Sequence, residues 1–161
     1  MNEGPLGKMT DDHTAEPGAA HPPGQELPDH PDLSLTLPAR AENVAVVRHA
    51  IGGLGEAIDI DDQTLSDVKL AVTEACTNAV VHAYPDGEGP LEVTVHVREN
   101  RLMLVVRDEG RGIMPRTDSP GLGLGLPLIA TLAEALELGT DSEKRTEVRM
   151  TFRLDADEVA A

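Results

Sequence analysis

Two segments with strict period-two alternation, joined by a short polar turn, most restrict what this chain can fold into. Leu91–Val97 reads LEVTVHV, and RLMLVVRD follows at Arg101–Asp108. Alternation of this kind is typical of a strand with one buried face. Because Glu99 and Asn100 can turn the chain between the two segments, the pattern predicts an antiparallel hairpin.

The other apolar patterns predict helices and strands on both sides of this hairpin along the chain. Leu33–Leu37 alternates as a first strand, and Thr146–Leu154 alternates as the last one. Helical spacing predicts a first helix that Pro38 opens, a long helix over Thr64–Ala83, and a third helix over Leu122–Leu136.

This order of elements predicts an α+β fold. We expect a two-layer sandwich in which a mostly antiparallel sheet is covered on one face by three helices. The folded domain should span residues 33–154. Residues 1–32 are expected to form a disordered, Pro-rich acidic tail, because half of the twelve prolines but only two leucines fall there. Residues 155–161 are expected to form a C-terminal tail.

The composition excludes some classes of partner. With Tyr84 and Phe152 as the only aromatics and a net charge of −16, the chain can neither stack bases on aromatic platforms nor attract phosphate backbones. The charge fits either simple solubility or steering toward a basic protein surface. Cys76 stands alone, which is compatible with a reducing cytoplasm. No signal peptide or membrane span is expected.

The long helix carries three polar side chains in one row. Glu74, Asn78 and His82 are spaced by four, so they form a slanted line on one helical face. Alanines such as Ala75 and Ala79 lie beside the row, so it borders the packed side of the helix. The row is either the solvated face of an amphipathic helix or part of a functional site, and the spacing alone leaves both open.

Two glycine-containing segments follow. DEGRG, Asp108–Gly112, comes directly after an apolar strand, and its glycines let the backbone approach a flat ligand. An ordinary turn has the same composition. PGLGLGLPLI, Pro120–Ile129, opens the predicted third helix with glycines, and such a helix start can cradle phosphate. The spacing differs from the dinucleotide-binding fingerprint, and no P-loop lysine follows.

Taken together, the three motifs resemble those of the bacterial anti-sigma-factor serine/threonine kinases, within the histidine-kinase-like (GHKL) ATPases. Glu74–His82 is similar to the family's N box, Asp108–Gly112 to its first glycine box, and Gly121–Leu126 to its second. The resemblance implies the family's ATP-binding fold and the use of ATP and Mg²⁺. It covers about residues 33–154.

The resemblance also implies roles for individual residues. Glu74 would be the general base, Asn78 would ligate Mg²⁺, and Asp108 would accept a hydrogen bond from the adenine amine. The remaining residues implied to bind ATP are Gly110, Gly112, Gly121, Gly123, Gly125 and Thr146. His82 either lines the phosphate side or packs at the helix end. Arg145 stands where the family usually has Gly, and it either crowds the adenine edge or points outward.

The function implied by the resemblance is that of a cytoplasmic ATP-dependent serine/threonine kinase and anti-sigma factor. Such a protein binds a sigma factor and phosphorylates a serine of an anti-sigma-factor antagonist, and it can form a homodimer. Arg48 is either a surface arginine or part of partner binding. The alternative is a nucleotide-binding regulatory module that acts by partner binding without kinase activity.

Overall fold

One layer of the molecule is a five-stranded antiparallel sheet. The computed structural model describes residues 26–110 and 125–154. Within them the strands lie in the order β1-β2-β3-β5-β4, and each neighbouring pair is antiparallel. The strands are β1 (Leu33–Pro38), β2 (Pro90–Arg98), β3 (Arg101–Asp108), β4 (Ala135–Thr140) and β5 (Thr146–Arg153). The predicted hairpin is confirmed as β2 and β3.

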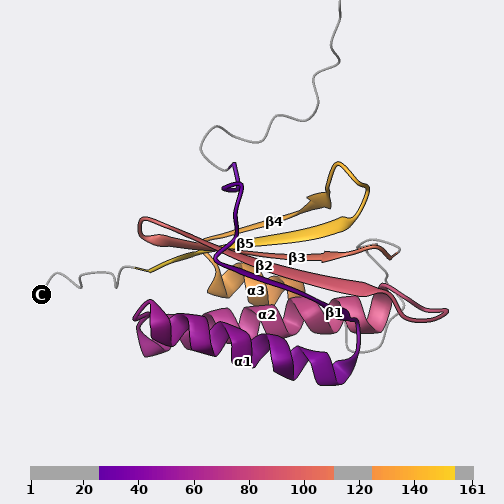
Figure 1. Ribbon diagram of the computed structural model, residues 1–161, viewed down its shortest axis with the longest axis horizontal. Coiled ribbons are helices and arrows are strands. Elements are labelled where there is room, and N and C mark those ends of the chain that lie inside the picture. Colours follow the sequence, from indigo (N-terminus) through magenta and orange to yellow (C-terminus); the bar gives the residue numbers. More distant parts are fainter. Residues whose placement is uncertain (1–25, 111–124, 155–161) are drawn as a thin grey trace, which may run out of the picture.

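Three helices form the second layer, on one face of the sheet (Figure 1). They are α1 (Ala41–Ala57), α2 (Asp62–His82) and α3 (Gly125–Leu132). The Asp61 side chain accepts a hydrogen bond from the backbone N–H of Thr64 at 2.9 Å, which caps the start of α2. The predicted two-layer α+β architecture is confirmed. None of the described helices has the length and apolarity needed to cross a membrane.

The core between the layers is almost entirely aliphatic. Alternate residues of β2, β3 and β5 meet the buried faces of α1 and α2, and Phe152 is the one aromatic ring that is fully in this core. Removing each large aliphatic side chain from water contributes roughly 1.5–3 kcal/mol. Cys76 is buried here too, and burial raises the pKa of its thiol to about 12. This thiol is therefore a packing residue.

The third helix ends four residues earlier than the sequence predicts, and the strand after it was missed. The prediction continued the helix to Leu136, but α3 ends at Leu132 and β4 begins at Ala135. The apolar residues of LIATLAEALEL suit either structure. Pairing with β5, which places Leu138 opposite Val148, decides for the strand because the edge of β5 needs hydrogen-bond partners.

The position predicted for Pro38 is also wrong. Pro38 is the last residue of β1 and does not open α1, which begins at Ala41. Its carbonyl accepts a hydrogen bond from the Asn43 side-chain amide at 2.7 Å. Because proline at the end of an edge strand and proline in a first helical turn both use a fixed φ, the sequence alone could not separate the two positions.

The sheet face opposite the helices, called here the outer face, is polar but partly buried. His96 is on this face and is only 4% exposed, and its Nδ1 has no hydrogen-bond partner among the described residues. Burial and the nearby Arg98 and Arg107 lower the pKa of His96, while Asp32 and the backbone of His30 act in the opposite direction. The ring is thus held in its neutral form.

Candidate nucleotide site

The polar row on α2 lies at the border of the core, as the sequence predicts. Glu74, Asn78 and His82 are each half-buried. On the same helix, Leu70 and Val81 lie beside Glu74 on the helix surface, and they are 42% and 60% exposed, more than any residue of the row. The row is therefore not the most solvated face of the helix, and its side chains are free to meet a ligand at the edge of the sandwich.

The first residue of α3 lies against two members of this row. A β-carbon added at Gly125 would be 3.2 Å from Asn78 Nδ2 and 3.4 Å from Glu74 Oε2. The start of a helix carries unpaired N–H groups and the positive end of the helix dipole. The structure therefore brings a carboxylate, an amide and a glycine helix start together, from two elements that are distant in sequence.

Asp108, the last residue of β3, accepts a hydrogen bond from the loop that follows it. It is 8% exposed, and its Oδ1 accepts a hydrogen bond from the Gly110 N–H at 3.0 Å. Burial raises the pKa of this carboxyl, and the Gly110 N–H partly offsets the effect. A β-carbon at Gly110 would overlap the carbonyl oxygen of Ala83. Only glycine fits here, because the loop packs directly on the backbone that follows α2.

Thr146 lies beside Asp108 across the sheet. The two are register partners in the β3–β5 pair, and both are buried on the helix-facing side of the sheet. Paired strand residues bring their side chains within about 5.5 Å at Cβ. The Asp108 and Thr146 side chains therefore lie next to each other on the same face of the sheet.

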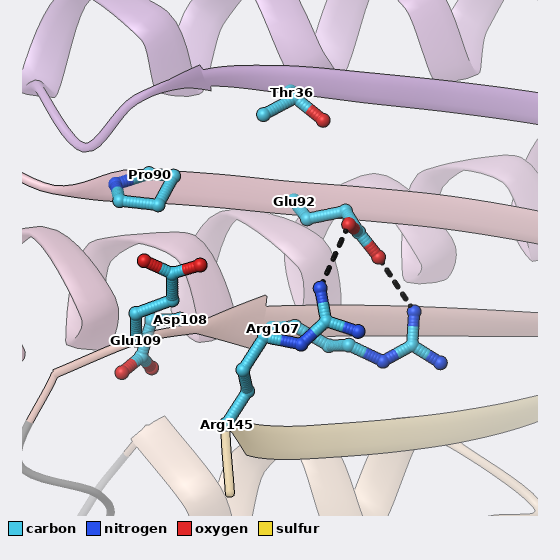
Figure 2. A pocket seen from close by; sticks show the side chains of 7 residues that line it. All are labelled: Thr36, Pro90, Glu92, Arg107, Asp108, Glu109 and Arg145. Carbon is cyan, nitrogen blue, oxygen red and sulfur yellow. Dashed lines mark hydrogen bonds and ion pairs between the residues drawn. The ribbon is translucent and has the colours of Figure 1, made fainter. Parts of the chain in front are cut away.

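The Arg145 guanidinium points toward carboxylates of the outer face, where Arg145 and Asp108 both line a pocket. Its guanidinium pairs with Asp141 at 2.7 Å and with Glu92 at 3.1 Å. Arg107 reaches the same Glu92 at 2.7 Å. Figure 2 shows both guanidinium groups converging on Glu92 in a pocket of the outer face. The Coulomb attraction of these carboxylates fixes the arginine outward, so the second of the two alternatives for Arg145 holds.

Other predicted site residues lie outside the described residues. Gly112, Gly121 and Gly123 fall in the range 111–124, and their roles stay predictions. Within residues 26–110 and 125–154, no three His, Cys, Asp or Glu side chains are grouped closely enough to hold a metal ion.

Sequence reasoning assigned no role to Tyr84, which connects three parts of the site. Its hydroxyl donates to the Pro90 carbonyl at 2.6 Å and accepts from the Glu109 N–H at 2.7 Å. A signal was present: a single tyrosine stands directly after the polar row, in a chain that is 1% aromatic. Buried tyrosine hydroxyls usually have a hydrogen-bond partner, but the sequence could not show which one.

Comparison with known proteins agrees with this geometry. Residues 37–152 match the family described as histidine kinase-like ATPase domain. The serine-protein kinase RsbW of Halalkalibacterium halodurans is 35% identical, over 79% of this chain and 86% of that protein. The chain belongs to the anti-sigma-factor serine-kinase family of histidine kinase-like ATPases. Membership in this family of ATPase domains implies the use of ATP.

Further relatives support the same assignment. The RsbW kinase of Bacillus thuringiensis is 33% identical, over 68% of this chain and 78% of that protein. Among solved structures, the RsbU and RsbW domains of a Mycobacterium tuberculosis protein superpose with a TM-score of 0.60 at 23% identity, covering 76% of this chain and 32% of that one. The SiaB–SiaC complex of Pseudomonas aeruginosa gives 0.55 at 17% identity, covering 76% and 89%. These two structures share the fold.

Proposed function

We propose that this chain is an ATP-dependent protein serine/threonine kinase and anti-sigma factor of the cytoplasm. It binds a sigma factor, and it phosphorylates a serine of an anti-sigma-factor antagonist. The observation that carries the proposal is the convergence of Glu74, Asn78 and the glycine start of α3, next to the Asp108–Thr146 pair. The curated relatives are named serine-protein kinases. These names indicate that the residue that accepts the phosphoryl group is a serine.

The described residues fit a nucleotide. Asp108 is a buried carboxylate with one internal donor, so it retains acceptor capacity for an adenine amine. Thr146 is beside it, and Gly110, whose missing side chain makes room for the Ala83 carbonyl, is proposed to shape the adenine pocket. Gly125 leaves space beside Asn78 and Glu74 that a side chain would fill. Gly121 and Gly123 are proposed to join it in contacting the phosphates, and Gly112 is proposed to shape the adenine pocket with Gly110.

Asn78 is the proposed ligand of Mg²⁺. Magnesium in phosphoryl-transfer sites keeps few protein ligands and takes its other oxygens from phosphate and water. A single amide oxygen on a rigid helix satisfies that requirement. Bound MgATP supplies the phosphoryl group and the charge neutralisation that its transfer needs.

Glu74 is the proposed general base. It lies one helical turn before Asn78, so the two side chains point to the same region. The Glu74 carboxylate would take the proton from the acceptor serine hydroxyl as the serine oxygen bonds to the γ-phosphorus of ATP, while the bond from that phosphorus to the β–γ bridging oxygen would break and release ADP. Its half-buried position at the edge of the core leaves room for a protein substrate to bring its serine within reach.

The proposed partners are proteins. The net charge of −16 favours association with a basic surface of the sigma factor. Arg48 is exposed on α1, where a partner can reach it, and a homodimer is compatible with the family. No nucleic acid or membrane partner is proposed.

The decisive experiment is phosphate transfer from radiolabelled ATP to the antagonist protein of the same organism. Glu74→Gln should lower the rate about a hundredfold to ten-thousandfold, with ATP affinity nearly unchanged. Glu56→Gln, an exposed glutamate of α1, is the matched control. Transfer by Glu74→Gln at the wild-type rate would exclude Glu74 as the base.

Calorimetric titration of ATP with and without Mg²⁺ tests the binding half of the proposal. Asn78→Ala should remove the magnesium-dependent part of the affinity, because it removes the only proposed protein ligand of the metal. Binding of ATP without transfer to the antagonist would favour the alternative, a regulatory module that acts by partner binding alone.

A further inference from the structure

Tyr84 joins the end of α2, the start of β2 and the loop after β3. The residue follows α2 by two positions. Its hydroxyl donates to the Pro90 carbonyl at 2.6 Å and accepts from the Glu109 N–H at 2.7 Å. Glu109 lies between Asp108, the proposed adenine acceptor, and Gly110. The hydroxyl thus bonds to the backbone of the segment that carries the acceptor.

The same segment has a second attachment next to Tyr84. Gly110 packs so closely on Ala83 that a β-carbon would overlap the Ala83 carbonyl. The Gly110 N–H in turn donates to the Asp108 carboxylate at 3.0 Å. Residues 108–110 are therefore fixed at Glu109 by a hydrogen bond and at Gly110 by contact, both from the two residues that follow α2.

The tyrosine is suited to this task. Burial raises the pKa of its hydroxyl, so the group stays protonated and can donate to one backbone atom while accepting from another. The ring lies over Gly89, where a β-carbon would overlap it. The aromatic ring fixes the position of the hydroxyl by packing, and the hydroxyl fixes the position of the loop.

We infer that Tyr84 is a positioning residue that sets the selectivity of the nucleotide site for adenine, by holding the Asp108–Gly110 segment in place. The inference rests on the proposed function, in which Asp108 accepts a hydrogen bond from the adenine amine. Tyr84 itself acts through Asp108. Tyr84 therefore affects which base the site prefers. It does not contribute to the phosphoryl transfer in which Glu74 is the proposed base.

The test compares the affinities of ADP and inosine diphosphate, which has a carbonyl oxygen where adenine has its amine. Calorimetry on the full chain gives both dissociation constants. The ratio of the two dissociation constants measures how strongly Asp108 favours ADP over inosine diphosphate. The ratio measured for Asp108→Asn gives the lower limit of this preference. Tyr84→Phe keeps the ring over Gly89 and removes only the hydroxyl. It should reduce the preference for ADP about fivefold, the effect of one hydrogen bond.

Glu88→Gln is the matched control. Glu88 is on the same turn and pairs with Arg40 at 2.6 Å, and within the described part of the chain no hydrogen bond joins it to residues 108–110. This variant should keep the wild-type preference for ADP. Equal weakening of ADP and inosine diphosphate by Tyr84→Phe, with the preference retained, would show a merely structural tyrosine and overturn the inference.

The same titrations separate the inference from the proposed function. A wild-type protein that prefers ADP, with an unchanged preference in Tyr84→Phe, removes the inference and leaves the proposed site intact. A wild-type protein that binds neither nucleotide, or binds both equally, overturns the assignment of Asp108 and with it the role of Tyr84.

Discussion

Replacing Asp108 by Asn should change nucleotide affinity and fold stability in opposite directions. The carboxyl is 8% exposed, and burial raises its pKa, so its ionised form is disfavoured by the fold. The Asn side chain keeps an oxygen that can accept from the Gly110 N–H, which donates to Asp108 at 3.0 Å in the wild type. The Asn side chain also carries no charge to desolvate. The variant should therefore be more stable than the wild type at neutral pH.

The pH dependence of this gain has a defined sign. Because the folded-state pKa of Asp108 is raised, its protonated form favours the fold, and that contribution is lost as the pH rises through the folded-state pKa. The stability advantage of Asp108→Asn should therefore be full at neutral pH. It should disappear in acid, below the ordinary carboxyl pKa of about 3.9, where Asp108 is protonated in both states.

The loss of nucleotide affinity follows from the chemistry of the amide. Asn can turn its oxygen to only one of the two partners, Gly110 N–H or the adenine amine, and it loses the charge that strengthens the bond. A hydrogen bond to a charged group contributes about 1.5–3 kcal/mol, so the dissociation constant for ADP should rise about 10- to 150-fold.

Chemical unfolding without nucleotide, at neutral and acid pH, measures the stability of both proteins, and calorimetry measures ADP binding. Asp29→Asn, the same exchange at an exposed aspartate outside the site, controls for the general effect of charge. A variant that loses stability at neutral pH, or that binds ADP as the wild type does, would refute the reasoning.

Three further outcomes are expected. Arg145→Gly should leave ADP affinity within about twofold, because the guanidinium pairs with Glu92 and Asp141 on the outer face and these carboxylates offset its charge; calorimetry checks this, and a large change would place Arg145 in the site. Gly110→Ala should cost about 1–3 kcal/mol in urea unfolding, since its β-carbon would overlap a backbone carbonyl. His96→Gln should reduce the loss of stability between neutral and mildly acid pH, because the lowered pKa of His96 means that its protonation below the ordinary value opposes the fold. The exposed His49→Gln is its control, and equal acid sensitivity in all three proteins would contradict the assignment.

Local patterns were enough for the parts of the fold with one clear periodicity. The alternation of Leu91–Val97 and Arg101–Asp108 predicted β2 and β3, and the apolar stripe of α2 predicted both its extent and its buried face. They failed where two periodicities coincide. The stretch after Gly125 is apolar enough for a long helix. Its second half instead forms β4, because it pairs with the edge of β5.

The sequence by itself determined the chemistry of this protein: the row from Glu74 to His82, the acid–glycine loop and the glycine run are readable as motifs because each is local. The tertiary structure alone decided how they meet. Sheet pairing places Thr146 beside Asp108, and the carboxylates of Glu92 and Asp141 hold Arg145, the residue before β5, on the outer face. The hydrogen bonds of Tyr84 to Pro90 and Glu109 depend on three segments that come together only in the folded chain. Such contacts have no local signal, because they exist only after loop closure has brought distant residues together.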